Sequence, residues 1–306
     1  MATTSLTSSL WGEIKCPVKF REPLQDKTYF GLGGPAEVFI VPRTTEDLKA
    51  ISILCSREGL PIYILGNGTN VLVKDRGISG VVVSLREHFN QLKFLGESRR
   101  EVRLQVEAGL GISSLLGLSI REGLSGLEFA AGLPGSLGGG VMMNAGLTDK
   151  TIGHLINEVT LMNREGNVYQ LTRDELVFNY RSTNIPPGDI VLAAEISLRK
   201  GDRQEIKNEV YRYYQRRKTT QPLRTLNAGC IFKNPPGDSA GRIIDSLGLK
   251  GFTIGRAQIS LIHANFIINQ GGATAAQVIG LIDYIRSRVL DELGINLELE
   301  IQILGE

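Results

Sequence analysis

The run of residues 132–140 restricts the fold more than any other part of the sequence, because five of its nine residues are glycine. A backbone without Cβ atoms can adopt positive φ angles and can approach an anion or another segment closely. Pro134 and these glycines also break any membrane-spanning helix over 123–147, where Glu128 is the one charged residue. A mobile surface loop is the alternative explanation, but apolar flanking residues favour a run that is held against a core.

A second glycine segment, Leu65-Gly66-Asn67-Gly68-Thr69-Asn70, follows an apolar run at 61–65 that predicts a strand. Free backbone N–H groups at the end of an element can point at an anion, and short polar side chains add donors suited to a diphosphate. A tight turn between two strands is an equally good explanation. Neither glycine segment has the ending of a P-loop or the spacing of a dinucleotide fingerprint, so neither identifies a nucleotide by itself.

Charge and cysteine usage limit the class of partner and the compartment. The 306 residues include 34 lysines and arginines against 32 aspartates and glutamates, a balance that excludes the strongly basic field typical of nucleic-acid binding. The amino-terminal residues lack a basic segment ahead of an apolar run, so no signal peptide is expected. An odd number of cysteines without paired spacing indicates free thiols in a reducing compartment, which predicts a cytoplasmic protein: Cys16, Cys55 and Cys230.

The three histidines, His88, His154 and His263, are scattered along the chain with no Cys or Glu at metal-ligand spacing beside them. We therefore expect no metal site. His263 is best explained as a core histidine whose ring hydrogen bonds are satisfied.

The hydrophobic periodicity predicts an α+β protein with a short tail and three further parts. The expected boundaries are a tail over 1–19, a first lobe over 20–91, a second lobe over 92–200 and a C-terminal α+β domain over 201–306. Helices are expected at 44–59, 113–122, 203–218, 240–246 and 274–293. Strands are expected at 36–42, 61–65, 71–73, 81–83, 102–107, 159–163, 168–171, 190–198, 263–269 and 297–304.

Six motifs occur in one order along the chain and together carry a family resemblance. They are the segment 65–70, the segment 132–146, Asn179-Tyr180-Arg181-Ser182, Gly229-Cys230-Ile231-Phe232-Lys233-Asn234-Pro235, His263-Ala264-Asn265-Phe266 and Leu297-x-x-Glu300. With these motifs the chain resembles the UDP-N-acetylenolpyruvoylglucosamine reductases from about residue 28 to 306. The short interval between Arg181 and Cys230 is similar to the subtype that lacks an inserted tyrosine loop.

The resemblance implies a vanillyl-alcohol-oxidase-type FAD-binding domain made of the two lobes, followed by a substrate-binding domain. It implies non-covalent FAD, NADPH as co-substrate and UDP-N-acetylglucosamine enolpyruvate as substrate, in a ping-pong reaction of peptidoglycan precursor synthesis. It implies no nucleic-acid or membrane partner, and we expect a monomer. The cofactor-binding residues implied by the match are Leu65, Gly66, Asn67, Gly68, Thr69, Asn70, Gly132, Pro134, Gly135, Ser136, Gly138, Gly139, Asn144 and Gly146.

Hydride addition to an enolpyruvyl group pushes electron density toward its carboxylate, so the reaction needs a fixed cation and a proton donor. The resemblance gives the first role to Arg181, whose planar fork suits a carboxylate, and the second to Cys230, where the family more often has serine. For Arg181 an ion pair with Asp189 or Glu175 is the plain alternative. Cys230 taken alone would be read as a small buried hydrophobe.

Glu300 is the third catalytic residue that the resemblance implies, near the substrate carboxylate or polarising a water beside the proton donor. Its plain alternative is the solvent face of the expected last strand, and periodicity alone does not distinguish it from Glu298. The implied substrate-binding residues are Lys218 and Asn234 for the diphosphate, with Asn265 as a weaker candidate.

Two other functions remain open from the sequence. The first is an FAD oxidase of the same fold that uses oxygen, although the glycine segments lack the histidine or cysteine that usually anchors its flavin covalently. The second is a non-catalytic module that binds a nucleotide sugar.

Overall fold

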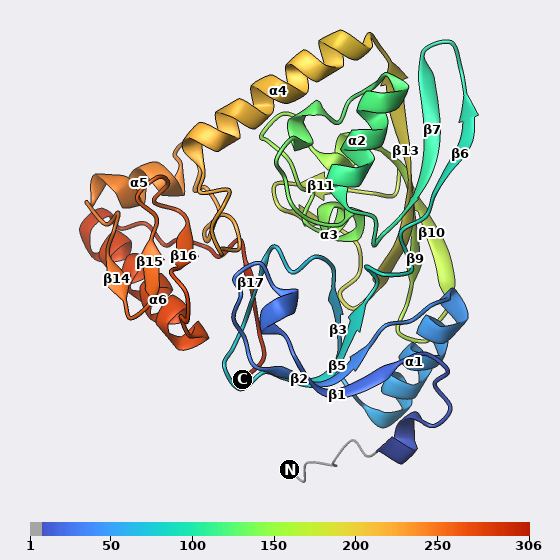
Figure 1. Ribbon diagram of the computed structural model, residues 1–306, viewed down its shortest axis with the longest axis horizontal. Helices are drawn as coiled ribbons and strands as arrows, with labels where there is room; N and C mark the ends of the chain where they lie inside the picture. The colour runs from blue at the N-terminus through green and yellow to red at the C-terminus, as the bar shows by residue number, and fades with distance from the viewer. Residues whose placement is uncertain (1–7) are drawn as a thin grey trace. The chain divides into compact units, whose positions relative to one another are not determined.

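The computed structural model describes residues 8–306, and the chain divides into two compact units (Figure 1). Unit 1 contains residues 8–22, Glu37–Asn67 and Gly80–Tyr214, and unit 2 contains Pro23–Ala36, Gly68–Ser79 and Gln215–Glu306. The sequence-based boundaries at 19, 91 and 200 differ from this division. Long-range strand pairing makes each unit from three separate segments, and composition along a chain does not reveal such pairing.

From residue 8 onward, the segment expected as a tail over 1–19 contains regular structure. A short 3₁₀ helix η1, Ser8–Trp11, precedes strand β1, Val18–Pro23. Trp11 is 4% exposed and Cys16 is 5% exposed, and both belong to the hydrophobic core of unit 1. The apolar contacts of these two side chains therefore hold this segment against the core. Residues 1–7 lie outside the described residues.

The first sheet has the strand order β1-β2-β5-β3, with β2 at Pro35–Ile40, β5 at Ile78–Ser84 and β3 at Ile62–Leu65. Strands β3 and β5 are parallel. Helix α1, Thr45–Glu58, begins with a capping box between Thr44 and Asp47 and ends at Gly59, whose φ is +65°. These local signals fix both ends of the helix, as the sequence predicts.

The second sheet has six strands and antiparallel pairing between all its neighbours. Its order is β10 (Val168–Thr172), β9 (Ile156–Met162), β13 (Ile190–Lys200), β7 (Glu101–Glu107) and β6 (Leu92–Glu97), and β8 (Leu124–Ser125) also pairs with β13. Helix α2 is Ile112–Glu122 and helix α3 is Leu137–Met142. Their buried side chains join the core that this sheet forms, and α3 packs on β13 and β7.

Helix α3 is the main local feature that the sequence did not predict. The glycine-dense run was expected to be irregular, yet residues 137–142 are helical and the Ser136 side chain caps the helix by accepting from the Gly139 N–H at 3.5 Å. Gly138 explains the composition, because a Cβ there would lie 2.9 Å from the Ala108 Cβ. The glycines therefore let the helix pack closely on the sheet at a cost in helix propensity.

The remaining elements of unit 1 are short, except for helix α4. They are the 3₁₀ helices η3 (Glu128–Ala130) and η4 (Ile152–Leu155), strands β11 (Phe178–Asn179) and β12 (Ser182–Thr183), and α4 (Arg203–Thr220), which continues into unit 2. Ile206 is the buried residue of α4, so most of this helix is exposed.

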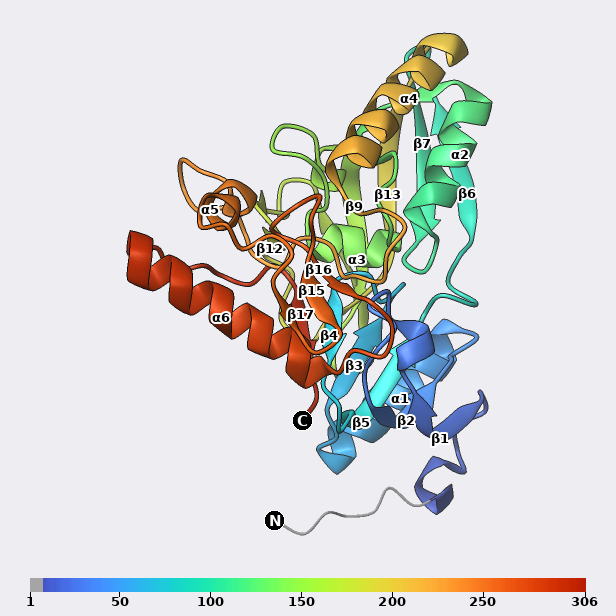
Figure 2. The same ribbon diagram turned by 60° about the vertical axis from the view of Figure 1, so that its left-hand side comes forward.

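Unit 2 has its own core around a three-stranded antiparallel sheet, β14 (Thr253–Ile254), β15 (Ala257–Ile259) and β16 (Ile267–Asn269). It also contains the 3₁₀ helix η2 (Gln25–Lys27) and helices α5 (Ala240–Ser246) and α6 (Ala275–Leu293), and α6 packs against β14 and β15. Figure 2 shows α6 together with β15 and β16. Strand β4 (Val71–Val73) pairs in parallel with β17 (Gln302–Leu304). Within residues 8–306 every helix is too short or too polar to span a bilayer.

Two expected strands are shorter in the structure than in the sequence pattern. The strand expected at 263–269 is β16 at 267–269, and the strand expected at 297–304 is β17 at 302–304. Glu300 therefore precedes the last strand instead of lying in it. Residues 298–300 are held to the segment 231–233 by backbone hydrogen bonds: the Lys233 N–H donates to the Glu298 carbonyl and the Glu300 N–H donates to the Ile231 carbonyl, each at 2.8 Å.

Candidate active site

The two glycine segments that the sequence singled out meet in unit 1. A Cβ at Gly66, directly after β3, would lie 2.5 Å from the Ser136 Oγ at the start of α3. Ser136 is 3% exposed and forms an isolated bridge with Gly111. The contact therefore needs glycine at position 66 and joins two motifs that are far apart in the sequence.

A buried polar atom in the first segment indicates how a ligand would bind there. The Asn67 Oδ1 is buried and accepts no hydrogen bond from any residue over 8–306. Such an atom costs about 1–3 kcal/mol unless a donor reaches it. FAD carries hydroxyl and N–H donors as well as phosphates. The unpaired Asn67 Oδ1 and the glycine segment 65–70 around it therefore fit this cofactor.

The predicted cofactor residues divide between the units. Gly68, Thr69 and Asn70 belong to unit 2, where Gly68 has a φ of +65° and a Cβ on it would lie 2.2 Å from the Lys27 carbonyl oxygen. The others belong to unit 1: Leu65, Gly66, Asn67, Gly132, Pro134, Gly135, Ser136, Gly138, Gly139, Asn144 and Gly146. Their assignment to FAD stays a prediction.

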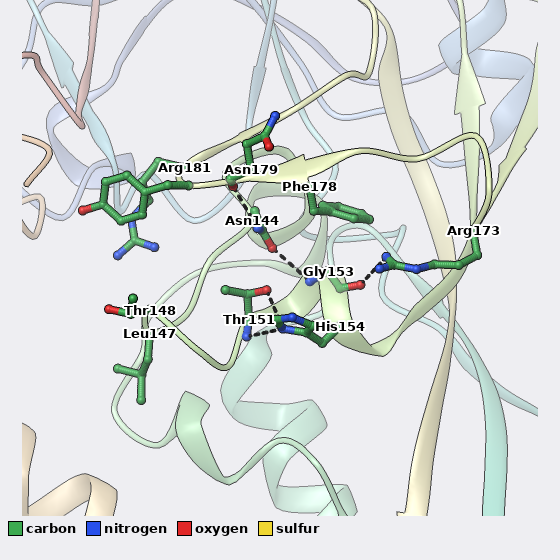
Figure 3. A pocket seen from close by; sticks show the side chains of 11 residues that line it. Asn144, Leu147, Thr148, Thr151, Gly153, His154, Arg173, Phe178, Asn179 and Arg181 are labelled. Atoms are coloured by element: carbon green, nitrogen blue, oxygen red, sulfur yellow. Dashed lines mark hydrogen bonds between the residues drawn. The ribbon is translucent and has the colours of Figure 1, made fainter. Parts of the chain in front are cut away.

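Arg181 lies at a pocket of about 360 Å³ in unit 1 (Figure 3). It occupies the two-residue turn between β11 and β12 with a φ of +56°, and its guanidinium carbon lies 5.0 Å from the centre of the Tyr180 ring. The pocket also includes residues that the sequence did not single out, among them His154, Arg173 and Phe178. A charged fork at a pocket of this size can bind an anionic group such as a carboxylate.

The two carboxylates proposed as alternative partners of Arg181 are occupied by other groups. Asp189 accepts a hydrogen bond from the Tyr169 hydroxyl. Glu175 accepts from both the backbone N–H and the hydroxyl of Thr172, each at 2.8 Å, and these bonds lower the pKa of Glu175. Each of these carboxylates thus has a hydrogen-bond partner of its own, and the role of Arg181 stays a prediction.

Unit 2 brings Cys230, Asn265 and Glu300 together through their backbones. The Ile231 N–H donates to the Asn265 carbonyl at 2.9 Å, and the Glu300 N–H donates to the Ile231 carbonyl at 2.8 Å. The Asn70 Nδ2 donates to the Glu300 carbonyl at 3.1 Å. One predicted cofactor residue and two predicted catalytic residues are therefore tied to the same backbone network.

The structure distinguishes the two glutamates that periodicity left equivalent. The side chain of Glu298 is 75% exposed and forms an ion pair with the Lys233 Nζ at 3.3 Å. Glu300 is half-buried next to the Cys230 segment. Glu300 is therefore the better placed of the two for chemistry near Cys230.

The predicted substrate-binding residues differ in their surroundings. Asn265 is 2% exposed, and both ends of its amide bond the backbone of Phe232: the Oδ1 accepts the N–H at 2.9 Å and the Nδ2 donates to the carbonyl at 2.8 Å. The Oδ1 of Asn234 accepts the N–H of Ala240 at 3.0 Å, and Lys218 is exposed in the last turn of α4. Asn265 thus holds the Cys230 segment, a role that one sequence cannot reveal.

No group of three or more His, Cys, Asp or Glu side chains that could hold a metal ion occurs in the described part of the chain. His263 is half-buried and its Nδ1 accepts the Asn265 N–H at 3.2 Å. Burial, followed by the charge of Lys250, lowers the pKa of His263. This contact agrees with a structural role for His263, although the ring is half-buried and not in the core.

Comparison with known proteins first identifies the class of protein to which this chain belongs. A family model described as "FAD binding domain" matches residues 36–172, and one described as "UDP-N-acetylenolpyruvoylglucosamine reductase, C-terminal domain" matches residues 221–304. With the fold described above, these matches define an FAD-dependent oxidoreductase with an α+β FAD-binding domain and a C-terminal α+β domain. The predicted fold class is confirmed.

Full-length relatives then identify the family. The chain is 42% identical over 289 residues to the UDP-N-acetylenolpyruvoylglucosamine reductase of Syntrophus aciditrophicus, covering 94% of this chain and 92% of the relative. It is 40% identical over 306 residues to that of Moorella thermoacetica, covering 100% and 99%. The crystal structure of the reductase from Thermus caldophilus matches with a TM-score of 0.82 and 37% identity, over 95% of this chain and 100% of that one. The chain belongs to the UDP-N-acetylenolpyruvoylglucosamine reductase family.

Proposed function

We propose that this protein reduces UDP-N-acetylglucosamine enolpyruvate to UDP-N-acetylmuramate with NADPH, as a cytoplasmic step of peptidoglycan precursor synthesis. The observation that carries the proposal is the similarity to curated reductases over the whole chain. The buried Asn67 Oδ1 supports it independently, because FAD carries donors that can bind this oxygen. We also propose that the protein acts as a monomer and binds its flavin without a covalent link.

When bound, FAD would supply the hydride carrier between NADPH and the vinyl carbon of the enolpyruvyl group. The segments 65–70 and 132–146 hold the cofactor. Glycine at 66, 68 and 138 lets these segments pack closely on neighbouring parts of the chain, since side chains at these positions would collide with Ser136, Lys27 and Ala108.

Arg181 binds the enolpyruvyl carboxylate and stabilises the negative charge that develops on it. Loss of one such preorganised contact typically lowers the rate by about 10² to 10³. A bidentate grip needs the planar guanidinium, so lysine is a poor replacement.

Cys230 donates the proton to the carbon next to the one that receives hydride. An ordinary thiol has a pKa near 8.5 and is mostly protonated at neutral pH, and positioned acids contribute roughly 10² to 10⁴ in rate. Glu300 orients the thiol or a water beside it. Lys218 and Asn234 bind the diphosphate of the sugar nucleotide.

The test uses the flavin-loaded protein under anaerobic conditions. NADPH should bleach the yellow flavin, and the enolpyruvyl sugar nucleotide should restore its colour. Cys230→Ala should leave bleaching intact and slow the return of colour at least 100-fold, whereas Cys230→Ser should keep appreciable turnover. Arg181→Lys should also slow the second step, and Arg57→Lys, an exposed arginine paired with Glu58, is the matched control.

Each alternative function predicts a different outcome. A colourless protein that binds the sugar nucleotide would indicate a binding module. Return of colour with oxygen but not with the enolpyruvyl compound would indicate an oxidase. Parental reoxidation in Cys230→Ala would remove the thiol from the mechanism.

A further inference from the structure

We propose that Asn144 is a positioning residue that fixes the turn carrying Arg181 and couples it to the glycine helix α3. The inference rests on the proposed role of Arg181. It assigns Asn144 a function distinct from contact with the cofactor, which the sequence predicted for it.

The hairpin that carries Arg181 cannot be stable by itself. Strands β11 and β12 contribute two residue pairs, Phe178 with Thr183 and Asn179 with Ser182, and isolated hairpins of any length are marginal in water. Arg181 adds strain, since a non-glycine residue in the left-handed region costs about 1–2 kcal/mol. Such a conformation persists where the surroundings determine it.

The Asn144 amide supplies one such constraint at the turn itself. Its Nδ2 donates to the Asn179 carbonyl at 2.9 Å, and its Oδ1 accepts the Gly153 N–H at 3.1 Å (Figure 3). A backbone carbonyl can only accept a hydrogen bond and a backbone N–H can only donate one, so these two partners determine which end of the Asn144 amide is the oxygen. Asn144 is 5% exposed, and at this burial the two bonds are difficult to replace with water.

Other contacts support the hairpin further from the turn. The Oδ1 of Asn184 accepts the Val177 N–H at 2.8 Å, and the guanidinium of Arg173 lies 5.5 Å from the centre of the Phe178 ring. These contacts hold the strands. The Asn144 bond reaches Asn179, which directly precedes the Tyr180-Arg181 turn, so it acts on the conformation of Arg181.

Asn144 also links this turn to the predicted cofactor segment. It lies two residues beyond α3, the helix whose N-terminal cap Ser136 contacts Gly66. Its own φ of +41° is tolerated best by asparagine, aspartate and glycine. One short helix thus has the contact between the two predicted cofactor segments at its start and the hairpin contact just after its end.

Asn144→Asp is the sharpest test, because it keeps the shape, the φ preference and the acceptor for Gly153 while removing the donor to Asn179. In the holoenzyme we expect the ratio of the reoxidation rate with the enolpyruvyl substrate to the reduction rate with NADPH to fall about 10²-fold, the typical effect of a misplaced catalytic group. The matched control is Asn157→Asp, which removes donation to Glu195 and Ser197 on β13 in the same unit. It should leave both rates within threefold.

A double-mutant cycle with Arg181→Lys distinguishes positioning from a general loss of structure. If Asn144 acts through Arg181, adding Asn144→Asp to Arg181→Lys should slow reoxidation less than threefold further. Multiplicative effects, or the same loss in Asn157→Asp, would overturn the inference.

Amide hydrogen exchange in the flavin-free protein is a readout that does not depend on activity. Asn144→Asp should speed exchange at residues 178–183 at least tenfold and leave the Gly153 amide protected. Unchanged exchange in the hairpin would also overturn the inference. Failure of NADPH to bleach the parent protein would instead refute the proposed function and leave the exchange result to decide the structural part.

Discussion

Asn265→Ala should destabilise the protein by about 2–6 kcal/mol. The asparagine amide satisfies the N–H and the carbonyl of Phe232, a residue that is 0% exposed, through bonds of 2.9 and 2.8 Å. Alanine leaves both backbone groups buried without a partner, and each such group costs about 1–3 kcal/mol. The loss is large because no water can reach these groups without opening the core of unit 2.

Equilibrium unfolding in urea, followed by circular dichroism, measures this loss. The matched control is Asn208→Ala, because Asn208 is exposed on α4 and accepts one hydrogen bond from Gln204 at 3.0 Å. A surface change of this kind should shift stability by no more than about 0.5 kcal/mol. Asn265→Asp should fall between the two, because it keeps the acceptor for the Phe232 N–H.

A specific result would refute this reasoning about Asn265. If Asn265→Ala unfolds at the parental urea concentration but raises the KM for the sugar nucleotide, its amide contacts the ligand and not the Phe232 backbone. The weak sequence-based assignment of Asn265 to substrate binding would then be right.

Three further expectations follow from the described contacts. Gly66→Ala should weaken FAD binding about 5- to 150-fold, because overpacking against Ser136 costs about 1–3 kcal/mol. Titration of the apoprotein with flavin measures this affinity. Gly117→Ala is the control and should bind FAD normally, because a Cβ at position 117 meets no atom within 4 Å. Asp75→Ala should lower the free energy of unfolding in urea by about 1–2 kcal/mol, because the Asp75 carboxylate accepts hydrogen bonds from the first two N–H groups of α6 at 2.7 and 2.9 Å. Parental stability of this variant would contradict the capping role. Burial and Lys250 hold the pKa of His263 below 6.5, so its neutral form stabilises the fold above that pH and stability is lost as the pH falls below about 6.5. The urea midpoint of His263→Gln should fall less between pH 6.5 and 5 than that of the parent, and equal slopes would exclude this histidine as the cause.

Helix ends were predictable because their causes are local. Thr44 and Asp47 form the capping box of α1, Gly59 ends it in the left-handed conformation, and Thr274 caps α6 in the same way. All of these lie within four residues of the end that they fix, so a single sequence contains the whole signal.

Elements that depend on distant partners were not predictable to the same extent. The length of β17 is set by its pairing with β4, not by the apolar alternation over 297–304. The helical form of the glycine run depends on its packing against Ala108. Neither partner is visible in the local pattern.

The same distinction applies to the candidate site. The sequence identified the residue types, but the partners of an amide come from elsewhere in the chain: Asn144 bonds Gly153 and Asn179, and Asn265 bonds Phe232. Similarly, Glu298 and Glu300 became distinguishable through Lys233, which is 65 positions from Glu298. Roles of this kind need the fold.

The parallel pair β4–β17 has a consequence for how each molecule is made. The Gln302 N–H donates to the Asn70 carbonyl and the Lys74 N–H to the Leu304 carbonyl, each at 2.9 Å. At about 5–20 residues per second, a ribosome needs roughly 10–50 s to travel from the first of these strands to the second. Throughout that interval the nascent chain lacks the strand that pairs with β4, directly after the predicted cofactor segment 65–70, so cofactor capture is expected only after β17 has been made.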